Sequence, residues 1–327
     1  MKALVTGARG FIGSFLVEQL LASGVEVHCL LRGTTSANVW ISGLTCKRIT
    51  GDITEPATLP QAVSQVDYVY HLAGCTKAVN RRQYEQINAD GTRNLLAATL
   101  AQNPAVKRFV LVSSLAAAGP SLNGEPLTEE DQPHPVSSYG RSKLRAEKIA
   151  LDYANKLPIT IIRPPGVYGP RDRDVYRYFK YARQGMRPVL SGGARSTSFI
   201  YVKDLARGII LASEVSAAIG QTYFLCDDEP YTWEELGAAI ASALDVQTRK
   251  LLLPVFLALP VAAIADLTAR IRNRPSIINL DKYKELKMSH WICSNDKAKK
   301  ELGFNTGFTL EEGIKETAEW YVENEWL

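Results

Sequence analysis

The residues best suited to chemistry are Tyr139 and Lys143, which stand four positions apart where apolar residues recur at helical spacing. This separation places both side chains on one face of a helix. A nearby ammonium group favours the phenolate form and is expected to lower the pKa of the phenol. A phenol with a lowered pKa can exchange a proton with a substrate oxygen at neutral pH. The same spacing also occurs in structural helices, but Ser113 and Ser114 at the end of a predicted strand upstream favour the catalytic interpretation.

A glycine-rich turn near the amino terminus predicts a second binding element. Residues 2–5 form a short apolar run, Gly7, Gly10 and Gly13 follow, and a helical pattern then extends to residue 24. Gly7 permits a tight turn, Gly10 lets the backbone approach a pyrophosphate, and Gly13 lets the helix lie close to the sheet. Amides at the start of the helix then face the phosphates, where the helix dipole favours negative charge. The alternative is a strand-to-helix turn without a ligand.

Further strands are predicted at residues 25–31, 47–50, 66–72 and 106–112, with turns or helical patterns between them. Strands that alternate with helices at this spacing predict an α/β fold, a doubly wound and mainly parallel sheet with helices on both faces. Ligands of such sheets bind at the carboxyl ends of the strands. The residues that follow each strand are therefore the candidates for cofactor contact.

Two of these positions bear on the choice of cofactor. Arg32 follows the second predicted strand, where an enzyme that prefers NAD usually carries Asp or Glu, and Arg9 lies in the glycine turn. Two guanidinium groups near the ribose favour NADP, because they can bind a 2′-phosphate. The alternative is that Arg32 stacks on the adenine. Asp52, after the third strand, either accepts a hydrogen bond from the adenine amino group or caps a helix.

Composition excludes several classes of protein. The chain has 327 residues, of which 46% are hydrophobic and 22% charged, and its net charge is +4. Its basic residues are scattered, which argues against nucleic-acid binding. The five cysteines form no pair at metal-ligand spacing, so we expect reduced thiols, no metal site and a cytoplasmic protein. No signal peptide is predicted, because glycine and arginine soon interrupt the first apolar run.

The longest apolar stretch, residues 251–265, is too short for a membrane-spanning helix and is interrupted by Pro254 and Pro260. No transmembrane segment is therefore expected. The stretch predicts one or two buried helices. The alternative is an apolar wall of a substrate pocket that touches a membrane surface.

Several ordered motifs together resemble the extended short-chain dehydrogenase/reductase superfamily, the NAD-dependent epimerase/dehydratase family, and especially its 3β-hydroxysteroid dehydrogenase-like branch. The resemblance extends over nearly the whole chain. The segments that carry it are residues 6–13, 51–53, 71–74, 91–96, 139–143 and 163–170.

The resemblance implies roles for individual residues. Tyr139 would be the acid/base, Lys143 would tune its pKa and bind the ribose, Ser114 rather than Ser113 would hydrogen-bond the substrate oxygen, and Thr76 would assist. Hydride would pass between the nicotinamide and a carbon that bears a hydroxyl or ketone. The residues expected to bind the cofactor are Gly7, Arg9, Gly10, Phe11, Ile12, Gly13, Arg32, Asp52, Ile53, Leu72, Ala73, Gly74, Tyr139, Lys143, Pro164 and Val167.

The substrate class is narrowed by residues 195–202. Nucleotide-sugar enzymes of this superfamily usually place an Arg-Asp pair where this chain has Thr197 and Ser198, and a neutral pair cannot neutralise a diphosphate. Arg195 would point to the same side as Thr197 and could partly substitute. The apolar stretch 251–265 also favours a relatively apolar secondary alcohol or ketone. The alternatives are a nucleotide-sugar epimerase or dehydratase with tightly bound NAD, and a cofactor-binding sensor.

The resemblance also implies a homodimer that acts on a small molecule, built from two domains. Residues 1–163 plus 199–226 would form the dinucleotide-binding Rossmann domain, and residues 164–198 plus 227–327 a smaller, discontinuous C-terminal substrate domain. A basic cluster in residues 171–187 either binds an anionic substrate or is a solvated helix face. Its members are Arg171, Arg173, Arg177, Arg183 and Arg187.

Overall fold

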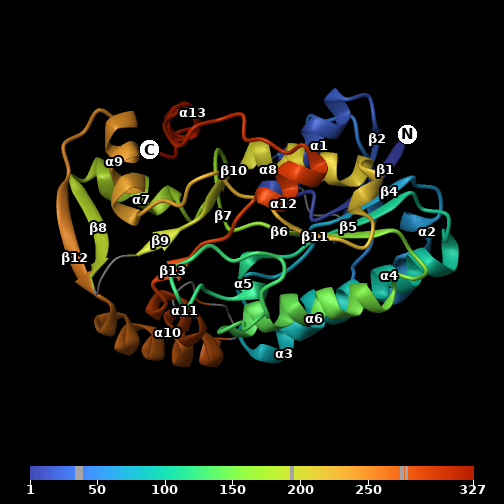
Figure 1. The fold of residues 1–327 in the computed structure, drawn as a ribbon, viewed down its shortest axis with the longest axis horizontal. Helices are drawn as coiled ribbons and strands as arrows, with labels where there is room; N and C mark the ends of the chain where they lie inside the picture. Colours follow the sequence, from blue (N-terminus) through green and yellow to red (C-terminus); the bar gives the residue numbers. More distant parts are fainter. Residues whose placement is uncertain (34–39, 192–194, 273–275, 277–278) are drawn as a thin grey trace.

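Short aliphatic and β-branched runs form the strands of a seven-stranded sheet (Figure 1). The computed structural model describes residues 1–33, 40–191, 195–272, 276 and 279–327. The strand order is β11-β6-β5-β4-β1-β2-β3, and all neighbouring pairs are parallel. The strands are β1 (Lys2–Thr6), β2 (Glu26–Leu31), β3 (Lys47–Thr50), β4 (Tyr68–His71), β5 (Arg108–Val112), β6 (Ile159–Arg163) and β11 (Thr222–Phe224). The predicted α/β class and parallel sheet are confirmed.

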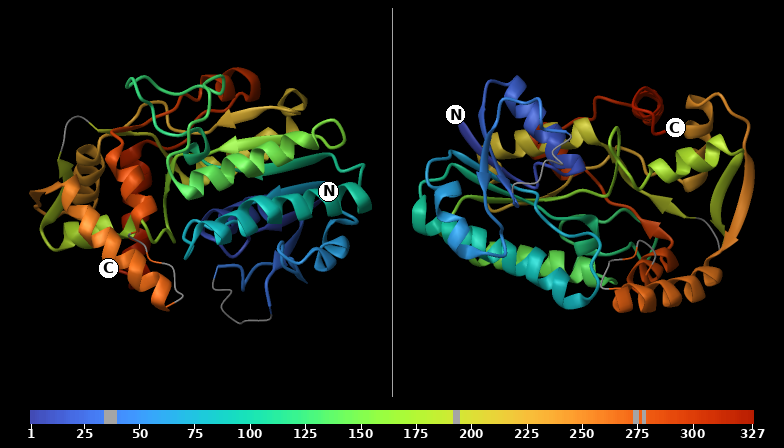
Figure 2. Two further views of the ribbon diagram at one scale, coloured as in Figure 1. Left: turned by 90° about the horizontal axis from the view of Figure 1, so that it is seen from below. Right: turned by 180° about the vertical axis from the view of Figure 1, so that it is seen from behind.

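Helices cover both faces of this sheet because its strands are apolar on both sides. In β1, Ala3 and Val5 belong to one buried cluster, whereas Leu4 belongs to the other. The helices α1 (Phe11–Ala22) and α8 (Val202–Glu214) supply side chains to the first cluster. The helices α4 (Gly91–Gln102) and α6 (Ser138–Asp152) supply side chains to the second (Figure 2). This arrangement explains why the strands show almost no alternation of polar and apolar residues.

The order of the strands creates a switch point between β1 and β4. The chain moves outward from β1 through β2 to β3 and then returns to place β4 on the other side of β1. Connections on the two sides of this point lie on opposite faces, which leaves a crevice at the carboxyl ends of the strands. The glycine turn after β1 and the loop after β4 both lie there.

Smaller elements form the other end of the molecule (Figure 1). Three two-stranded ladders pair β7 (Gly166–Tyr168) with β10 (Phe199–Tyr201), β8 (Met186–Ser191) with β12 (Arg249–Pro254), and β9 (Ser196–Thr197) with β13 (His290–Trp291). The accompanying helices are α7 (Tyr176–Arg183), α9 (Trp233–Ala243), α10 (Ala258–Arg272), α11 (Leu280–Lys287), α12 (Asp296–Leu302) and α13 (Leu310–Glu323). Shorter helices are α2 (Pro60–Val63), α3 (Arg81–Tyr84) and α5 (Leu115–Ala118).

Chain segments from both predicted domains share one core. Strand β11 and helix α8 return to the large sheet, as the proposed division implies. Phe304, Leu310 and Ile314, from the predicted substrate domain, are buried in the same cluster as α1 and α8. The exact domain boundaries therefore stay a prediction, and residues 34–39, 192–194, 273–275 and 277–278 within them lie outside the described part of the chain.

The prediction of buried helices for residues 251–265 is wrong. Leu251, Leu252 and Leu253 form the middle of strand β12, and Phe256 and Ile264 are more than 60% exposed. A run of three leucines places side chains on both faces of a strand. Because β12 pairs only with β8 in a two-stranded ladder, neither face is fully covered.

A buried ion pair joins α6 to β6. Glu147 accepts two hydrogen bonds from Arg163, to Oε1 at 3.0 Å and to Oε2 at 2.7 Å. Both residues are almost completely buried. The two parallel bonds orient both charges and fix the helix that carries Tyr139 and Lys143 against the end of the sheet.

We expect Glu147→Gln to lower the free energy of unfolding by about 3 kcal/mol, because the change leaves the buried Arg163 charge uncompensated. Urea unfolding followed by circular dichroism measures the change. The matched control is Glu234→Gln, which breaks the exposed pair with Lys250 (2.6 Å) and should cost less than about 1 kcal/mol. Equal losses in the two variants would contradict the importance assigned to the buried pair.

Candidate active site

The turn after β1 brings three glycines into direct backbone contact. A Cβ on Gly13 would lie 2.2 Å from the carbonyl oxygen of Gly7, and one on Gly7 would lie 2.8 Å from Ala73 N. Gly7 has a φ of +75°, which L-residues with side chains rarely adopt. Gly10 is the N-cap of α1 and offers no capping side chain, and the first turn of α1 has no acidic residue. The amides of Phe11, Ile12 and Gly13 therefore stand at a positive helix end suited to an anion.

Arg9 and Arg32 lie together at the carboxyl ends of β1 and β2. Arg9 Nη1 donates to the backbone carbonyl of Arg32 at 3.0 Å, and the Arg32 residue itself is exposed. The structure thus brings both guanidinium-bearing residues beside the glycine turn.

The other predicted cofactor residues after β3 and β4 lie at the same sheet edge. Asp52 Oδ1 accepts hydrogen bonds from the backbone N–H (2.8 Å) and the hydroxyl (2.9 Å) of Thr54, so this carboxylate closes a turn rather than capping a helix. Ile53 is buried against Gly91. The loop of Leu72, Ala73 and Gly74 begins where Thr6 Oγ1 accepts the Ala73 amide at 3.0 Å.

Tyr139 and Ser114 are brought together from α6 and from the end of β5. Ser114 is the N-cap of α5, where its hydroxyl accepts the Ala116 amide at 3.1 Å, and the same hydroxyl bonds to the Tyr139 phenol. Burial raises the pKa of Tyr139 to about 12, and the Ser114 hydrogen bond opposes this only in part. The expectation that Lys143 lowers the pKa of this phenol is wrong for the protein alone.

The position of the Lys143 side chain explains why the pKa of Tyr139 is not lowered. Its Nζ donates to the carbonyl of Val112 at 2.7 Å instead of reaching the phenol. Burial lowers the pKa of Lys143 to about 8, and Glu147 one turn away opposes that shift. At neutral pH the ammonium form still predominates. A Cβ on Gly74 would lie 3.9 Å from Nζ, so the ammonium group also lies beside the loop after β4.

The other predicted site residues, Thr76, Pro164 and Val167, lie around Tyr139 and Lys143. Thr76 is exposed, and its carbonyl accepts the Tyr84 hydroxyl at 3.3 Å. The Tyr84 ring lies 6.1 Å from the Tyr139 ring, so Thr76 reaches the catalytic tyrosine only through another residue. Pro164 is buried directly after β6, and its carbonyl accepts the Leu115 amide at 2.8 Å. Val167 is half-buried in β7.

Two positioning residues were not predicted from the sequence. Asp281 on α11 accepts the backbone amides of Ser138 (2.5 Å) and Tyr139 (3.3 Å), so a carboxylate from 143 residues away stabilises the positive end of α6. Asn88, in the π-helical turn Glu85–Asp90, donates to the Ser142 hydroxyl at 2.9 Å and accepts the Cys75 amide at 2.7 Å. The helical segment that carries Asn88, ahead of Tyr139 and Lys143 in the chain, is a weak sequence signal. No sequence pattern indicates the role of Asp281.

Arg171, a member of the predicted basic cluster, and Arg195 both make contacts within the fold. Arg171 donates to Glu18 Oε1 at 2.6 Å, and its guanidinium carbon lies 4.4 Å from the centre of the Phe15 ring. Arg195 donates to the carbonyls of Leu286 (2.8 Å) and Met288 (3.1 Å). Both side chains hold elements of the fold together, and Arg195 is thereby drawn away from the role of a diphosphate clamp.

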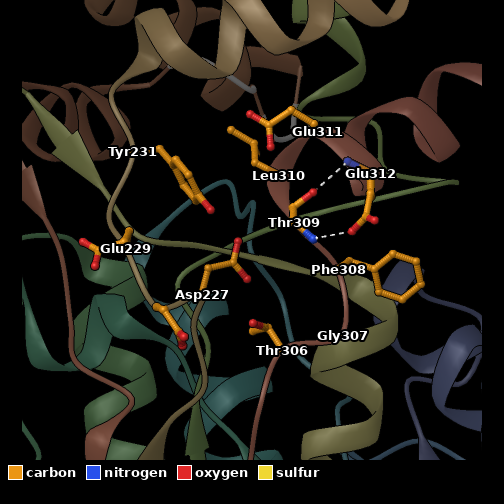
Figure 3. Close-up of a pocket in the computed structure, with 11 residues that line it drawn as sticks. Asp227, Glu229, Tyr231, Thr306, Gly307, Phe308, Thr309, Leu310, Glu311 and Glu312 are labelled. Atoms are coloured by element: carbon orange, nitrogen blue, oxygen red, sulfur yellow. Dashed lines mark hydrogen bonds between the residues drawn. The ribbon is translucent and has the colours of Figure 1, made fainter.

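A cavity of about 440 Å³ lies apart from these residues, between residues 227–231 and 306–312 (Figure 3). Asp227 faces it with both carboxyl oxygens lacking a hydrogen-bond partner. Burial, together with Asp204 and Asp228, raises the pKa of Asp227 to about 8. The carboxyl group therefore keeps its proton at neutral pH and does not present the charge that a cation would require.

The described residues contain no cluster of three or more His, Cys, Asp or Glu side chains that could hold a metal ion. All five cysteines are free thiols. Within the described part of the chain, every helix is too short or too polar to cross a bilayer.

Comparison with known proteins identifies the family. Residues 3–226 match the NAD dependent epimerase/dehydratase family. A ceramide reductase from Caulobacter vibrioides is 32% identical over 324 residues, which cover 99% of this chain and 95% of the relative. A 2-alkyl-3-oxoalkanoate reductase from Shewanella oneidensis is 27% identical over 334 residues, which cover 96% of this chain and 84% of the relative.

Among solved structures, a UDP-glucose 4-epimerase from Thermotoga maritima superimposes with a TM-score of 0.80 over 99% of this chain and 100% of that one. At 24% identity this likeness shows the fold alone. The chain belongs to the NAD dependent epimerase/dehydratase family and is an enzyme that uses a nicotinamide cofactor. The resemblance found in the sequence is confirmed.

We expect Gly13→Ala to weaken dinucleotide binding by roughly tenfold to a hundredfold, because the new methyl group displaces the Gly7 carbonyl and with it the amides that would face the phosphates. Isothermal titration with NADPH and NADH measures the affinity. The control is Gly43→Ala, since a Cβ at Gly43 meets no atom within 4 Å. Unchanged affinity in Gly13→Ala would contradict the phosphate-binding role of the turn.

Proposed function

We propose that this enzyme is an NADP-preferring reductase of relatively apolar ketones, with Tyr139 as the acid/base and Ser114 as the hydrogen-bond donor to the substrate oxygen. The observation that carries the proposal is the hydrogen bond between the Ser114 hydroxyl and the half-buried Tyr139 phenol, with Lys143 one helical turn farther along α6. The residues of the glycine turn fit a dinucleotide, because side chains at Gly7 and Gly13 would fill the space that the backbone needs. Arg9 and Arg32 support a 2′-phosphate at the ribose.

The proposed reaction starts from a protonated phenol. Burial raises the pKa of Tyr139 to about 12, so the phenol carries its proton at neutral pH. A nicotinamide, when bound, would supply the hydride. Tyr139 would give its proton to the ketone oxygen, and Ser114 would donate a hydrogen bond to that same oxygen. The Lys143 ammonium donates to the Val112 carbonyl in the protein alone, so its proposed stabilisation of the phenolate requires that this bond is broken.

Three observations support an apolar substrate. Thr197 and Ser198 carry no charge where a diphosphate would need one, and Arg195 is bound to carbonyls of the α11 segment. The name of the Shewanella relative specifies an oxoalkanoate, a keto acid that carries alkyl chains, and both curated relatives described above are named reductases. The free thiols support a reducing, cytoplasmic location.

The competing function is a nucleotide-sugar epimerase or dehydratase with tightly bound NAD, which the fold of the Thermotoga enzyme keeps open. Purification distinguishes the two functions. A cofactor that copurifies and is never released indicates the epimerase. Net oxidation of added NADPH by ketones indicates the reductase.

For the assigned chemistry, we expect Tyr139→Phe to lower kcat by roughly a hundredfold to ten-thousandfold, because the proton donor is removed. Steady-state assays with a panel of ketones measure kcat, and titration with NADPH should show affinity within about threefold of wild type, which is under 1 kcal/mol. Tyr84→Phe is the matched control, since it removes a neighbouring phenol whose partner is the Thr76 carbonyl. Substantial activity in Tyr139→Phe would overturn the assignment.

For the cofactor preference, we expect Arg32→Asp to weaken NADPH binding by about tenfold or more and to leave NADH binding nearly unchanged, because a carboxylate repels the 2′-phosphate. Titration with both cofactors measures the ratio of affinities. Lys47→Asp makes the same change in charge on the exposed part of β3 and should leave the ratio unaltered. An equal loss for both cofactors in Arg32→Asp would show that Arg32 does not read the phosphate.

A further inference from the structure

Strand β12 and helix α10 lie at the opposite end of the molecule from β1 and β2 (Figures 1 and 2), and their segment carries an exposed apolar surface. We call it the apolar ridge. It consists of Leu251, Leu252, Leu253, Phe256, Leu257, Leu259, Val261 and Ile264. These are eight of the fourteen exposed large hydrophobic residues in the described part of the chain, gathered within fourteen consecutive positions. Such a concentration marks an interaction surface rather than ordinary scatter.

The helical part of the ridge carries bulky apolar side chains on its exposed face. Leu257, Val261 and Ile264 follow each other at spacings of four and three residues, which places them on one helical face. That face is exposed, whereas Ala262 and Ala269 of α10 are buried. Val261 and Ile264 therefore point away from the protein, whereas Ala262 and Ala269 point into it.

Cationic residues bracket the ridge at both ends. Arg249 and Lys250 precede it in the sequence, with Lys250 paired to Glu234 of α9 at 2.6 Å, and two arginines end the α10 sequence. Residues 249–272 contain four cationic residues and one acidic one, and residues 176–191, which form α7 and the strand β8 that pairs with β12, contain four and none. Helix α9 packs on α7 and β8 and adds Glu234 and Glu235, so the three segments together have a net charge of +5, which exceeds the +4 of the whole chain.

We propose that the apolar ridge docks onto the surface of a bilayer that contains anionic phospholipids, with α10 lying in the interfacial plane. A helix with a bulky apolar face and basic ends inserts that face at the boundary between headgroups and acyl chains. The flanking cations add attraction to anionic headgroups, at about 1 kcal/mol for each cation near the surface. The protein is thereby held on the membrane and does not cross it.

Charge favours a bilayer over a second copy of the chain. In a two-fold dimer the same surface would face itself, so the cationic ends of the two ridges would lie close together. Like charges placed across an interface oppose association. Anionic headgroups complement the same cations.

The position of the ridge connects it to the active site. Helix α10 packs on α11, and Asp281 of α11 accepts the Ser138 and Tyr139 amides at the start of α6. Docking would therefore hold the Tyr139 end of α6 towards the membrane side. The proposal itself stands on the exposed residues and charges, so it is independent of the substrate class.

The test is cosedimentation of the full chain with sucrose-loaded vesicles of phosphatidylcholine, with or without about one-third phosphatidylglycerol. We expect binding to the anionic vesicles that weakens at high salt. The double variant Phe256→Ser, Ile264→Ser should bind at least tenfold more weakly, since two exposed apolar side chains that would enter the bilayer are lost. Leu122→Ser is the matched control, because Leu122 is 72% exposed on a loop outside the ridge.

A second pair of changes, Arg249→Gln with Lys250→Gln, tests the charge and should reduce the dependence on both salt and phosphatidylglycerol. Light scattering on all variants reports the oligomeric state, and thus also the predicted homodimer. Wild-type protein that stays in the supernatant with both kinds of vesicle overturns the proposal. So does a ridge variant that dissociates an oligomer while vesicle binding is unchanged, since the ridge would then join two copies. Ketone reductase activity is measured separately, so its absence leaves the vesicle result intact.

Discussion

A buried ammonium group constrains the centre of this enzyme. Lys143 is 6% exposed, and a charge in that position is costly unless the protein supplies partners. The Val112 carbonyl at the end of β5 accepts a hydrogen bond from it, and Glu147 lies one helical turn away. Glu147 is itself buried and is neutralised by Arg163 on β6. Helix α6, which carries Tyr139 and Lys143, is thus held to strands β5 and β6 by buried charged groups. Moving one of these groups would leave another without its partner.

The buried Lys143 charge also affects residues near the loops after β1 and β4, where the dinucleotide is predicted to bind. His71 at the end of β4 is buried with both ring nitrogens bonded, to Thr6 and Thr92. Burial, with the Lys143 charge nearby, lowers the pKa of His71 to about 3, so the ring stays neutral. Thr6 also accepts the Ala73 amide, which aligns the loop after β4 with the glycine turn after β1. The two predicted cofactor loops are therefore joined by hydrogen bonds through Thr6, and the Lys143 charge acts on the adjoining His71 ring.

Most of the active site could be predicted because its residues are local signals. The glycine spacing after β1 and the Tyr139–Lys143 spacing each encode a backbone geometry within a few residues, and both elements formed where expected. The pKa of Tyr139 could not be predicted in this way. Its direction depends on the balance between burial and a neighbouring charge, and Lys143 instead bonds to the Val112 carbonyl.

The sequence by itself determined the parallel α/β sheet and five of its strands, β1 to β5, because periodicity and glycine placement act over short distances, and it supplied the candidates for the reacting groups. Only the tertiary structure decided which charges meet. Asp281 reaches α6 from 143 residues away, and Arg171 binds Glu18 of α1. Only the tertiary structure shows that the large apolar residues within 251–264 lie exposed. An apolar run has the same sequence whether or not another element of the fold covers it. Long-range packing decides coverage, and no local pattern records it.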